Sequence, residues 1–411
     1  MEKEPGIMQR KLWNKDTVLM LQGSAVSALG DILYSVAIGY WVYEKTMSSA
    51  LMGMMSSISM FMTMFVMPFS GSIVDKCSRK GIIVGMDALR GVLMLALGTL
   101  AFTDKLSVPM VLLAALLASV CSVFFSPAVS TLMLDLIPHD DMVRGQSVFS
   151  GVNSLINLAG KAVSGALVAF LGVPLIILLN GVSYLISAFT ELFISVPKTV
   201  HQGETITLRG ILSDFQVGVR EIFRNRYLKL FVPSVLILNL LGAGPMTLML
   251  PFTLEKGFTV DMYGYLMSVE TAASLLCVCL LGIVRLKPKS RYLGMSVGFV
   301  AAVLFYTAAY LTKSYGFMCV MIFFGSFANA LGNSIFSASM MLALPEENRG
   351  AILGFINSAS TGGCALSALL FGVLGDVFPL YLVFIAGNLL SAVPMIYMCL
   401  HKNTREFILA N

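Results

Sequence analysis

Twelve long apolar stretches, separated by short charged segments, dominate this chain of 411 residues. They lie near residues 17–43, 50–74, 81–103, 107–132, 143–171, 173–196, 228–254, 262–284, 292–312, 315–341, 350–374 and 377–400. A helix needs about 20 predominantly apolar residues to cross the hydrocarbon core of a bilayer. Only 12% of the residues are charged, about half the share that covers a soluble globular protein. The sequence therefore predicts an all-α polytopic membrane protein with 12 transmembrane helices.

The stretches fall into two groups of six around a polar interlude. We expect an N-terminal six-helix bundle over residues 1–197, a cytoplasmic linker over 198–227 and a C-terminal six-helix bundle over 228–411. Within the linker, apolar residues recur at the spacing of one helix face, which predicts an amphipathic helix lying at the membrane surface. These residues are Leu208, Ile211, Leu212, Phe215, Val219 and Ile222.

The basic residues indicate an orientation. If both termini lie in the cytoplasm, only Lys45, Lys105, Lys256 and Lys313 of the 27 lysines and arginines fall outside the cell. Cytoplasmic loops of membrane proteins carry an excess of lysine and arginine. The net charge of +5 is therefore interpreted as a topology signal, and no nucleic-acid partner is expected.

The two halves also resemble each other. Arg144-Gly145 opens the fifth stretch and Arg349-Gly350 opens the eleventh, 205 residues later, about half the chain length. Two six-span halves in parallel repeat are typical of secondary transporters in which two bundles rock against each other. The sequence predicts such a pair of pseudo-symmetric bundles.

The segment after the second stretch carries the most specific motif, Gly71-x-x-x-Asp75-Lys76-x-x-Arg79-Lys80. It resembles the loop motif of the major facilitator superfamily, with Ser78 where a glycine is usual. The resemblance covers nearly the whole chain. Asp31, the pair Asp87-x-x-Arg90, and Pro138 followed by Arg144-Gly145-Gln146 are similar to the macrolide and drug efflux branch, which also includes siderophore exporters.

The resemblance implies a conformational latch, with Gly71, Asp75, Arg79, Lys80, Asp87, Arg90 and Arg349 as its candidates. Asp75 and Arg79 have the i, i+4 spacing of an ion pair on one helix. The family pattern places Asp75 beside the start of the eleventh span at Arg349, where a helix N-terminus favours an anion. A solvated basic loop is the alternative. Asp87 and Arg90 neutralise each other or join the same network.

Ionisable residues at membrane depth are the best functional candidates, because each costs about 2.5–3.5 kcal/mol at a helix centre unless it is paired or wetted. Asp31 lies near the middle of the first stretch, on one stripe with Ser24, Ser27, Tyr34 and Ser35. Since the first span lines the central cavity in the family, Asp31 is expected to bind a proton or a cationic substrate. A buried structural acid is the alternative.

Lys161 lies on a polar stripe of the fifth stretch with Asn153 and Asn157, where family exporters carry a proline. At 1.5 Å per residue, Lys161 and Glu270 of the eighth stretch lie about 16 and about 13 Å from the outer ends of their spans. The family fold makes these spans neighbours, so we expect a Lys161–Glu270 pair. An Asp31–Lys161 pair and a static pair that only fixes register are the alternatives.

Further polar residues lie at helical spacing within apolar stretches. Asn329 and Asn333 share a face of the tenth stretch, and Asn357 lies on a face of the eleventh. Each is expected either to contact substrate or to hydrogen-bond between helices. Glu191, late in the sixth stretch, is expected at the membrane interface with Tyr184 packing nearby.

Several function classes lack the residues they need. The sequence has no Gly-x-x-x-x-Gly-Lys-Ser/Thr loop for ATP and no catalytic serine or zinc motif. Three histidines and seven cysteines form no metal-ligand pattern. No enzyme activity, metal or cofactor is expected, and an ion gradient is the expected energy source.

The sequence as a whole predicts a secondary efflux transporter of amphiphilic drug-like compounds, driven by proton antiport and alternating access. A transporter of the same fold for a lipid, a siderophore or an anionic metabolite is the alternative, with Lys161 gripping the anion. A membrane receptor without transport activity is a third possibility. The expected partners are the small amphiphilic substrate, protons and membrane lipid. The protein is expected to act as a monomer in the inner (plasma) membrane.

Overall fold

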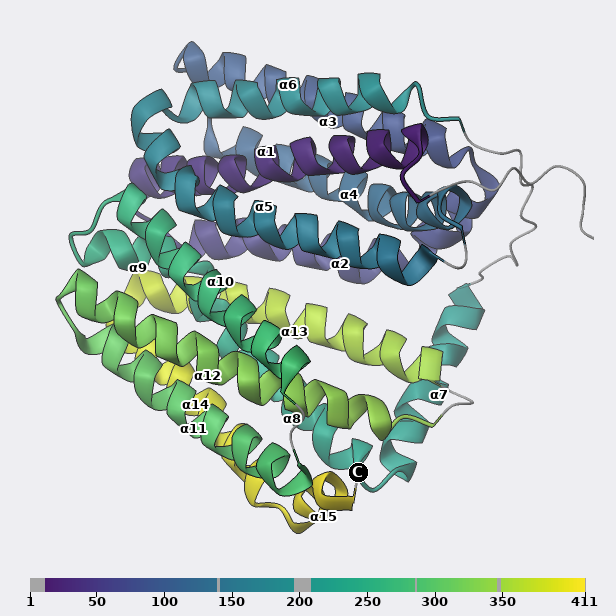
Figure 1. Cartoon of the computed structure of the whole chain (residues 1–411). Coiled ribbons are helices and arrows are strands. Elements are labelled where there is room, and N and C mark those ends of the chain that lie inside the picture. Colours follow the sequence, from purple (N-terminus) through teal and green to yellow (C-terminus); the bar gives the residue numbers. More distant parts are fainter. Residues whose placement is uncertain (1–11, 139–140, 196–207, 285–286, 346–348, 411) are drawn as a thin grey trace, which may run out of the picture. The chain divides into compact units, whose positions relative to one another are not determined.

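The computed structural model describes residues 12–138, 141–195, 208–284, 287–345 and 349–410. These residues form helices joined by short loops (Figure 1). Twelve of the described helices are long and apolar enough to cross a membrane, which confirms the predicted twelve spans. They are α1 (Lys15–Thr46), α2 (Ser49–Lys76), α3 (Arg79–Phe102), α4 (Val108–Leu136), α5 (Met142–Leu171), α6 (Val173–Glu191), α8 (Leu228–Thr247), α10 (Val260–Ile283), α11 (Pro288–Leu311), α12 (Tyr315–Leu342), α13 (Arg349–Val377) and α14 (Leu380–Leu400).

The chain divides into two compact units. The first contains Met1–Ile38 and Phe65–Ile206, and the second contains Gly39–Met64 and Thr207–Asn411. The division cuts both α1 and α2, so the first half of α2 groups with the C-terminal helices. Within the first unit α3 packs against α6 and α4. Within the second unit α11 packs against α14 and α12, which repeats the same pairing half a chain later.

Each unit has its own apolar core. The first core gathers apolar side chains from α1 to α5, including Met20, Val74, Ile83, Leu132 and Phe149. The second gathers side chains from α8 and α11 to α15 (Lys402–Ala410), including Phe231, Met295, Phe336, Ile352 and Met398. Because many other large apolar side chains are exposed on the helices, the outer surface of each unit suits a hydrocarbon environment.

The start of α2 packs against α13 within the second unit. Ser57 Oγ donates to the carbonyl of Ala365 at 2.8 Å. Asp376, at the end of α13, accepts a hydrogen bond from Ser48 Oγ at 2.7 Å and further bonds from the amides of Ser49 and Ala50. A carboxylate at these positions satisfies amides that have no partner within α2 and complements the helix dipole.

The seventh apolar stretch forms two helices instead of one. α8 ends at Thr247, and α9 (Met249–Glu255) follows after Leu248. Pro245 lacks an amide hydrogen, and the amide of Leu248 bonds back to the Pro245 carbonyl at 2.9 Å. A proline near the end of a helix removes a hydrogen bond and favours such a break.

The polar interlude contains α7 (Leu208–Arg224). Its last turn is anchored to the second unit: Ile222 is buried in the core of that unit, and Asn225 Nδ2 donates to the Ala343 carbonyl at 3.1 Å. The side chains of residues 208–215 lie outside the described set, so the predicted apolar face of this helix stays a prediction.

Candidate functional site

Asp31 lies at the midpoint of α1, and its side chain is exposed on the first unit. On its inner side the carboxylate accepts a hydrogen bond at Oδ1 from the hydroxyl of the buried Tyr184 on α6, and the buried Asn180 of the same helix lies within hydrogen-bonding reach. The half-buried Tyr34 lies one turn further along α1, and its hydroxyl has no hydrogen-bond partner among the described residues. One side of the Asp31 carboxylate is therefore accessible to a ligand or a proton, and its other side is held in one orientation by the Tyr184 hydroxyl.

Two glycines on α1 allow the polar face of α6 to approach. A Cβ at Gly30 would lie 2.3 Å from Asn180 Oδ1, and a Cβ at Gly23 would lie 2.8 Å from Glu191 Oε1. Both distances are shorter than real Cβ contacts, so a side chain at either position would force the Asn180 or Glu191 side chain to move. The seven-residue spacing places both on one face of α1, which brings the polar side chains of α6 to the helix that carries Asp31.

Behind Asp31 lies a buried ion pair on α3. Arg90 Nη1 is 3.5 Å from Asp87 Oδ1, and the two side chains are 4% and 0% exposed. Ser27 Oγ of α1 donates to Asp87 Oδ2 at 3.3 Å. The Arg90 guanidinium also faces the rings of Phe125 at 4.8 Å and Tyr184 at 5.4 Å, a cation–π arrangement that partly replaces its lost hydration. Asp87 and Arg90, whose spacing predicts mutual neutralisation, thus form an ion pair that is enclosed by the protein.

Glu191 extends this polar cluster to the end of α6. The side chain is 1% exposed, and its predicted depth at the membrane interface stays a prediction. Ser187 Oγ donates to Glu191 Oε1 at 3.1 Å. Sequence reasoning did not include Glu191 or Ser187 among the candidates. The signal that was available is the spacing of Tyr184, Ser187 and Glu191, which places all three on one helix face.

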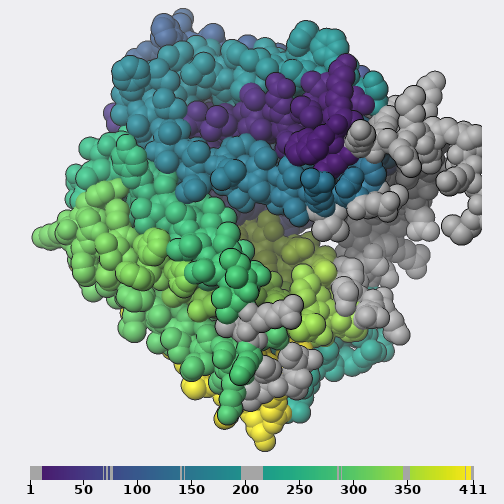
Figure 2. Space-filling view, in the orientation of Figure 1, coloured from purple at the N-terminus to yellow at the C-terminus, as the bar shows by residue number. Residues whose placement is uncertain are grey.

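The polar stripe of α5 lies on an exposed face of the first unit. Asn153 and Asn157 are exposed and Lys161 is half-buried; Figure 2 shows α5 on the visible surface of this unit. Asn157 Nδ2 donates to the carbonyl of Asn153 at 3.0 Å, within its own helix. These amides are therefore on a surface where a ligand can reach them.

In the second unit, Glu270 on α10 is half-buried. Its carboxylate lies near enough to act electrostatically on the hydroxyls of Tyr263, Tyr306 and Tyr310. Glu270 and Lys161 belong to different units, and their pairing stays a prediction.

The predicted asparagines of the second unit lie on partly open helix faces. Asn333 on α12 is exposed and Asn329 is half-buried. Asn333 Nδ2 donates to Asn329 Oδ1 at 2.8 Å, within the same helix. Asn357 on α13 is exposed, and its carbonyl accepts from Thr361 Oγ1 at 2.8 Å. The hydrogen bonds described for these side chains are local to one helix.

Two of the predicted latch residues, Arg79 and Lys80, have partners elsewhere in the first unit. Arg79 forms an ion pair with Asp135 on α4, and both side chains are largely buried. Lys80 Nζ donates to the Leu192 carbonyl at 2.6 Å, just beyond the end of α6. Gly71, Asp75 and Arg349 lie on helices, but their surroundings fall outside the described residues, so the Asp75 latch stays a prediction.

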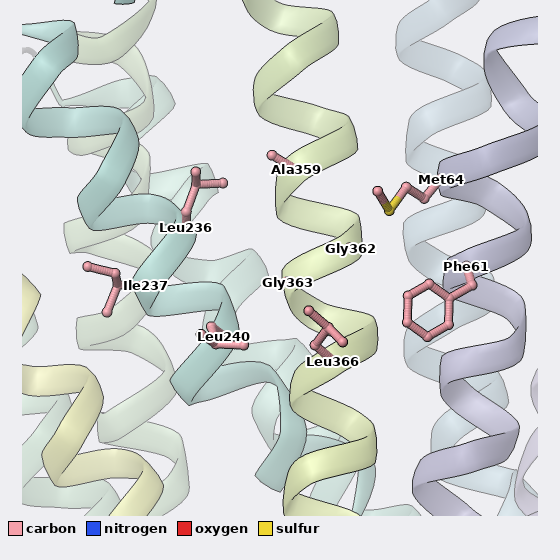
Figure 3. A pocket seen from close by; sticks show the side chains of 9 residues that line it. All are labelled: Phe61, Met64, Leu236, Ile237, Leu240, Ala359, Gly362, Gly363 and Leu366. Carbon is pink, nitrogen blue, oxygen red and sulfur yellow. The ribbon is translucent and has the colours of Figure 1, made fainter. Parts of the chain in front are cut away.

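An apolar groove of about 330 Å³ lies in the second unit between α2, α8 and α13 (Figure 3). Its wall includes Phe61 and Met64 from α2, Leu236 and Leu240 from α8, and Gly362 from α13. A Cβ at Gly362 would lie 2.6 Å from Met64 Sδ. The absence of a side chain at Gly362 therefore leaves room for the Met64 thioether in the groove.

Comparison with known proteins agrees with this architecture. The family model of the Major Facilitator Superfamily matches residues 20–368. The candidate bacilysin exporter BacE of Bacillus subtilis is 30% identical over 51% of this chain and 51% of its own length. Macrolide efflux protein A of Streptococcus pyogenes is 23% identical over 52% of this chain and 53% of its own length. The chain thus spans about half the length of these two relatives.

The solved structure of the nucleoside transporter NupG has the same fold. It matches with a TM-score of 0.72 at 16% identity and covers 93% of this chain and 100% of that chain. Three findings indicate the same fold. The described residues form twelve helices long and apolar enough to span a membrane, NupG matches over its full length, and the family model extends over most of the sequence. This chain is a multi-pass membrane protein that belongs to the Major Facilitator Superfamily of transporters.

Proposed function

We propose that this protein is a secondary active exporter of amphiphilic, drug-like compounds, coupled to protons by antiport and alternating access. The observation that carries the proposal is Asp31: an exposed carboxylate at the middle of a spanning helix, oriented by the buried Tyr184. An acid at this depth is costly unless it is wetted or paired, and residues of this kind are typical of substrate and proton pathways.

The chemistry of antiport follows from one carboxylate with two competing occupants. When Asp31 is ionised it attracts a cationic substrate, and when it is protonated that attraction is lost. Proton binding then releases the substrate, and substrate binding releases the proton. Because one charge moving across 100 mV is worth about 2.3 kcal/mol, proton entry supplies the free energy for export.

Other residues fit a substrate that is greasy with a few polar groups. The exposed Asn153, Asn157, Asn333 and Asn357 offer amide donors and acceptors, and the groove beside Phe61 offers apolar surface. Ligand sites of this type are mostly apolar with a small number of polar groups. The names of BacE and macrolide efflux protein A support export of such compounds, as does the resemblance of the Asp31 and Arg144 segments to the efflux branch.

The remaining parts of the proposal concern topology and gating. The protein lies in the inner (plasma) membrane with both termini in the cytoplasm and acts as a monomer. Lys161 and Glu270 pair in one state of the cycle and separate in another. Asp75, next to the ion-paired Arg79, closes the cytoplasmic side against the start of α13 at Arg349.

The test uses ethidium, an amphiphilic cation, as the probe in everted membrane vesicles that contain the full chain. We expect ethidium accumulation that collapses when a protonophore dissipates the proton gradient. Asp31→Asn should abolish accumulation, whereas Asp104→Asn, which neutralises an exposed acid in the loop between α3 and α4, should leave it unchanged. Accumulation that survives the protonophore, or Asp31→Asn vesicles that work as well as the wild type, would contradict the proposal. Transport of an organic anion that Lys161→Ala abolishes would support the lipid or anionic metabolite alternative instead.

A further inference from the structure

The interior of the first unit holds more acid than base. Its buried charged side chains, among the residues that the structure describes, are Asp87, Arg90 and Glu191. The guanidinium of Arg90 lies on Asp87 at 3.5 Å. The two buried carboxyls, Asp87 and Glu191, therefore have one buried cation between them, and that cation, Arg90, is paired with Asp87.

Among the described residues, Glu191 has only a hydroxyl as its hydrogen-bond partner, although Asp87 and Arg90 also act on it electrostatically. Its Oε1 accepts one hydrogen bond from the Ser187 hydroxyl at 3.1 Å, and its Oε2 is buried without a hydrogen-bond partner among the described residues. Moving an ionised carboxylate into such surroundings costs far more than a single hydroxyl returns. A neutral carboxylic acid fits this site: Oε1 accepts from Ser187, and Oε2 carries the proton.

The groups between Glu191 and Asp31 form a continuous row. The Ser187 hydroxyl lies within hydrogen-bonding reach of Asp87 as well as of Glu191. Asp87 contacts Arg90. The Arg90 guanidinium lies against the ring of Tyr184, whose hydroxyl donates to Asp31. From Tyr184 to Glu191 the row rises about 10 Å along α6 at 1.5 Å per residue.

Arg90 connects the two ends of this row. Its charge acts on Asp31 as well as on Asp87. Its Nε and Nη2 are buried without a hydrogen-bonded oxygen or nitrogen among the described residues, and the guanidinium also lies within hydrogen-bonding reach of the Cys121 thiol on α4. One guanidinium thus acts on two carboxyls. The other titratable groups that face the row are Tyr34 on α1, Cys121 on α4 and, at the end of α6, Lys80; Lys161 follows Gly160, which packs on Leu29 and Ile32 of α1.

We propose that Glu191 is a second proton carrier, which releases its proton at the cytoplasmic end of α6, beside the exposed Leu192, and receives the next one from Asp87 through Ser187. Asp87 takes the incoming proton while Arg90 is turned toward ionised Asp31, because Asp87 then lacks its countercharge. The transfer is balanced: when Arg90 returns, protonated Asp87 gives its proton to the Ser187 oxygen while the Ser187 hydroxyl passes its own hydrogen to Glu191 Oε1, so Asp87 becomes a carboxylate and Glu191 a neutral acid. This inference rests on the proposed proton-coupled function and adds a carrier away from the substrate.

The first test measures the proton on Glu191 without any substrate. Infrared spectroscopy of the purified full chain distinguishes the carbonyl stretch of a protonated carboxyl from that of a carboxylate. At neutral pH we expect the difference spectrum between the wild type and Glu191→Gln, an isosteric change, to contain a protonated-carboxyl band, and the difference spectrum between the wild type and Asp104→Asn to contain none. The absence of that band from the Glu191→Gln difference spectrum would overturn the inference.

The second test separates proton coupling from folding. In proteoliposomes, a pH difference of one unit supports about tenfold accumulation of ethidium for each coupled proton, whereas exchange of internal for external ethidium requires no net proton movement. We expect Glu191→Gln to lose gradient-driven accumulation and keep exchange at close to the wild-type rate. Ser187→Ala should keep the infrared band and slow accumulation only.

The outcomes distinguish this inference from the proposed function. Equal loss of accumulation and exchange in Glu191→Gln would show a structural role and overturn the relay. Accumulation by Glu191→Gln that matches the wild type would overturn it as well. If the wild type itself moves no ethidium, the proposed function fails for this probe, and the infrared band alone supports or overturns a proton on Glu191.

Discussion

Arg90 is the residue on which the interior of the first unit depends. It is 4% exposed, and its guanidinium lies between the fully buried carboxylate of Asp87 and the rings of Phe125 and Tyr184. A planar, delocalised cation suits this site because it can contact a carboxylate at its edge and aromatic rings at its faces at the same time. A lysine ammonium cannot reproduce that geometry.

Arg90→Met is expected to destabilise the protein by about 3–5 kcal/mol, because it leaves Asp87 as an uncompensated buried charge. Adding Asp87→Asn should recover most of this loss. The measurement is thermal unfolding in detergent. Lys402→Met is the control: it removes an exposed ion pair with Glu406, which is worth at most about 1 kcal/mol. Equal unfolding temperatures for Arg90→Met and Lys402→Met would show that the buried ion pair contributes no more to stability than the exposed one.

Tyr184→Phe removes the hydrogen bond that the Tyr184 hydroxyl donates to the Asp31 carboxylate while keeping the ring against Arg90. A hydrogen bond to a charged group is worth about 1.5–3 kcal/mol, so we expect ethidium export to fall about tenfold or more with little change in unfolding temperature. Tyr381→Phe, which removes an exposed hydroxyl on α14, should export at the wild-type rate. Unchanged export by Tyr184→Phe would mean that Asp31 needs no orientation.

At the scale of elements, the packing of α2 on α13 depends on the absence of side chains. A Cβ at Gly53 would lie 2.1 Å from the carbonyl oxygen of Ala368. That oxygen belongs to the backbone, so it cannot move aside without displacing α13. Small residues at helix contacts let backbones approach closely in membranes, and the neighbouring bond from Ser57 to Ala365 forms only at such a separation.

The same substitution is therefore expected to have opposite effects at two glycines. Gly53→Ala should destabilise the protein by about 1–3 kcal/mol through overpacking. Gly354→Ala, in the open part of α13 where a Cβ meets no atom within 4 Å, should stabilise it by about 0.5–1 kcal/mol through lower backbone entropy of the unfolded chain. Unfolding temperatures in one detergent compare the two. A rise for both variants would contradict the close contact of α2 and α13.

At the scale of the whole molecule, the spans were predictable and their partners were not. Run length and hydropathy alone locate the twelve helices, because each crossing needs its own apolar stretch. The same reasoning treats residues 228–254 as one helix and misses the break at Leu248, for which Pro245 was the available signal. Periodicity gives the face on which Asp31 lies. It does not reveal Tyr184, 153 residues away, or the burial of Glu191, because these depend on which helices pack together.

The prediction that links the two units concerns Lys161 and Glu270. Depth along their helices, counted from sequence, matches to within about one turn, and an unpaired charge at this depth is costly. We therefore expect Lys161→Met and Glu270→Gln each to reduce gradient-driven ethidium accumulation strongly. The double variant with Lys161→Glu and Glu270→Lys swaps the two charges. If Glu270 also carries a proton, this variant should regain ethidium exchange but not accumulation, because the acid then lies on α5 instead of α10. Full recovery of accumulation would show a static pair, and unimpaired single variants would show that no pair forms.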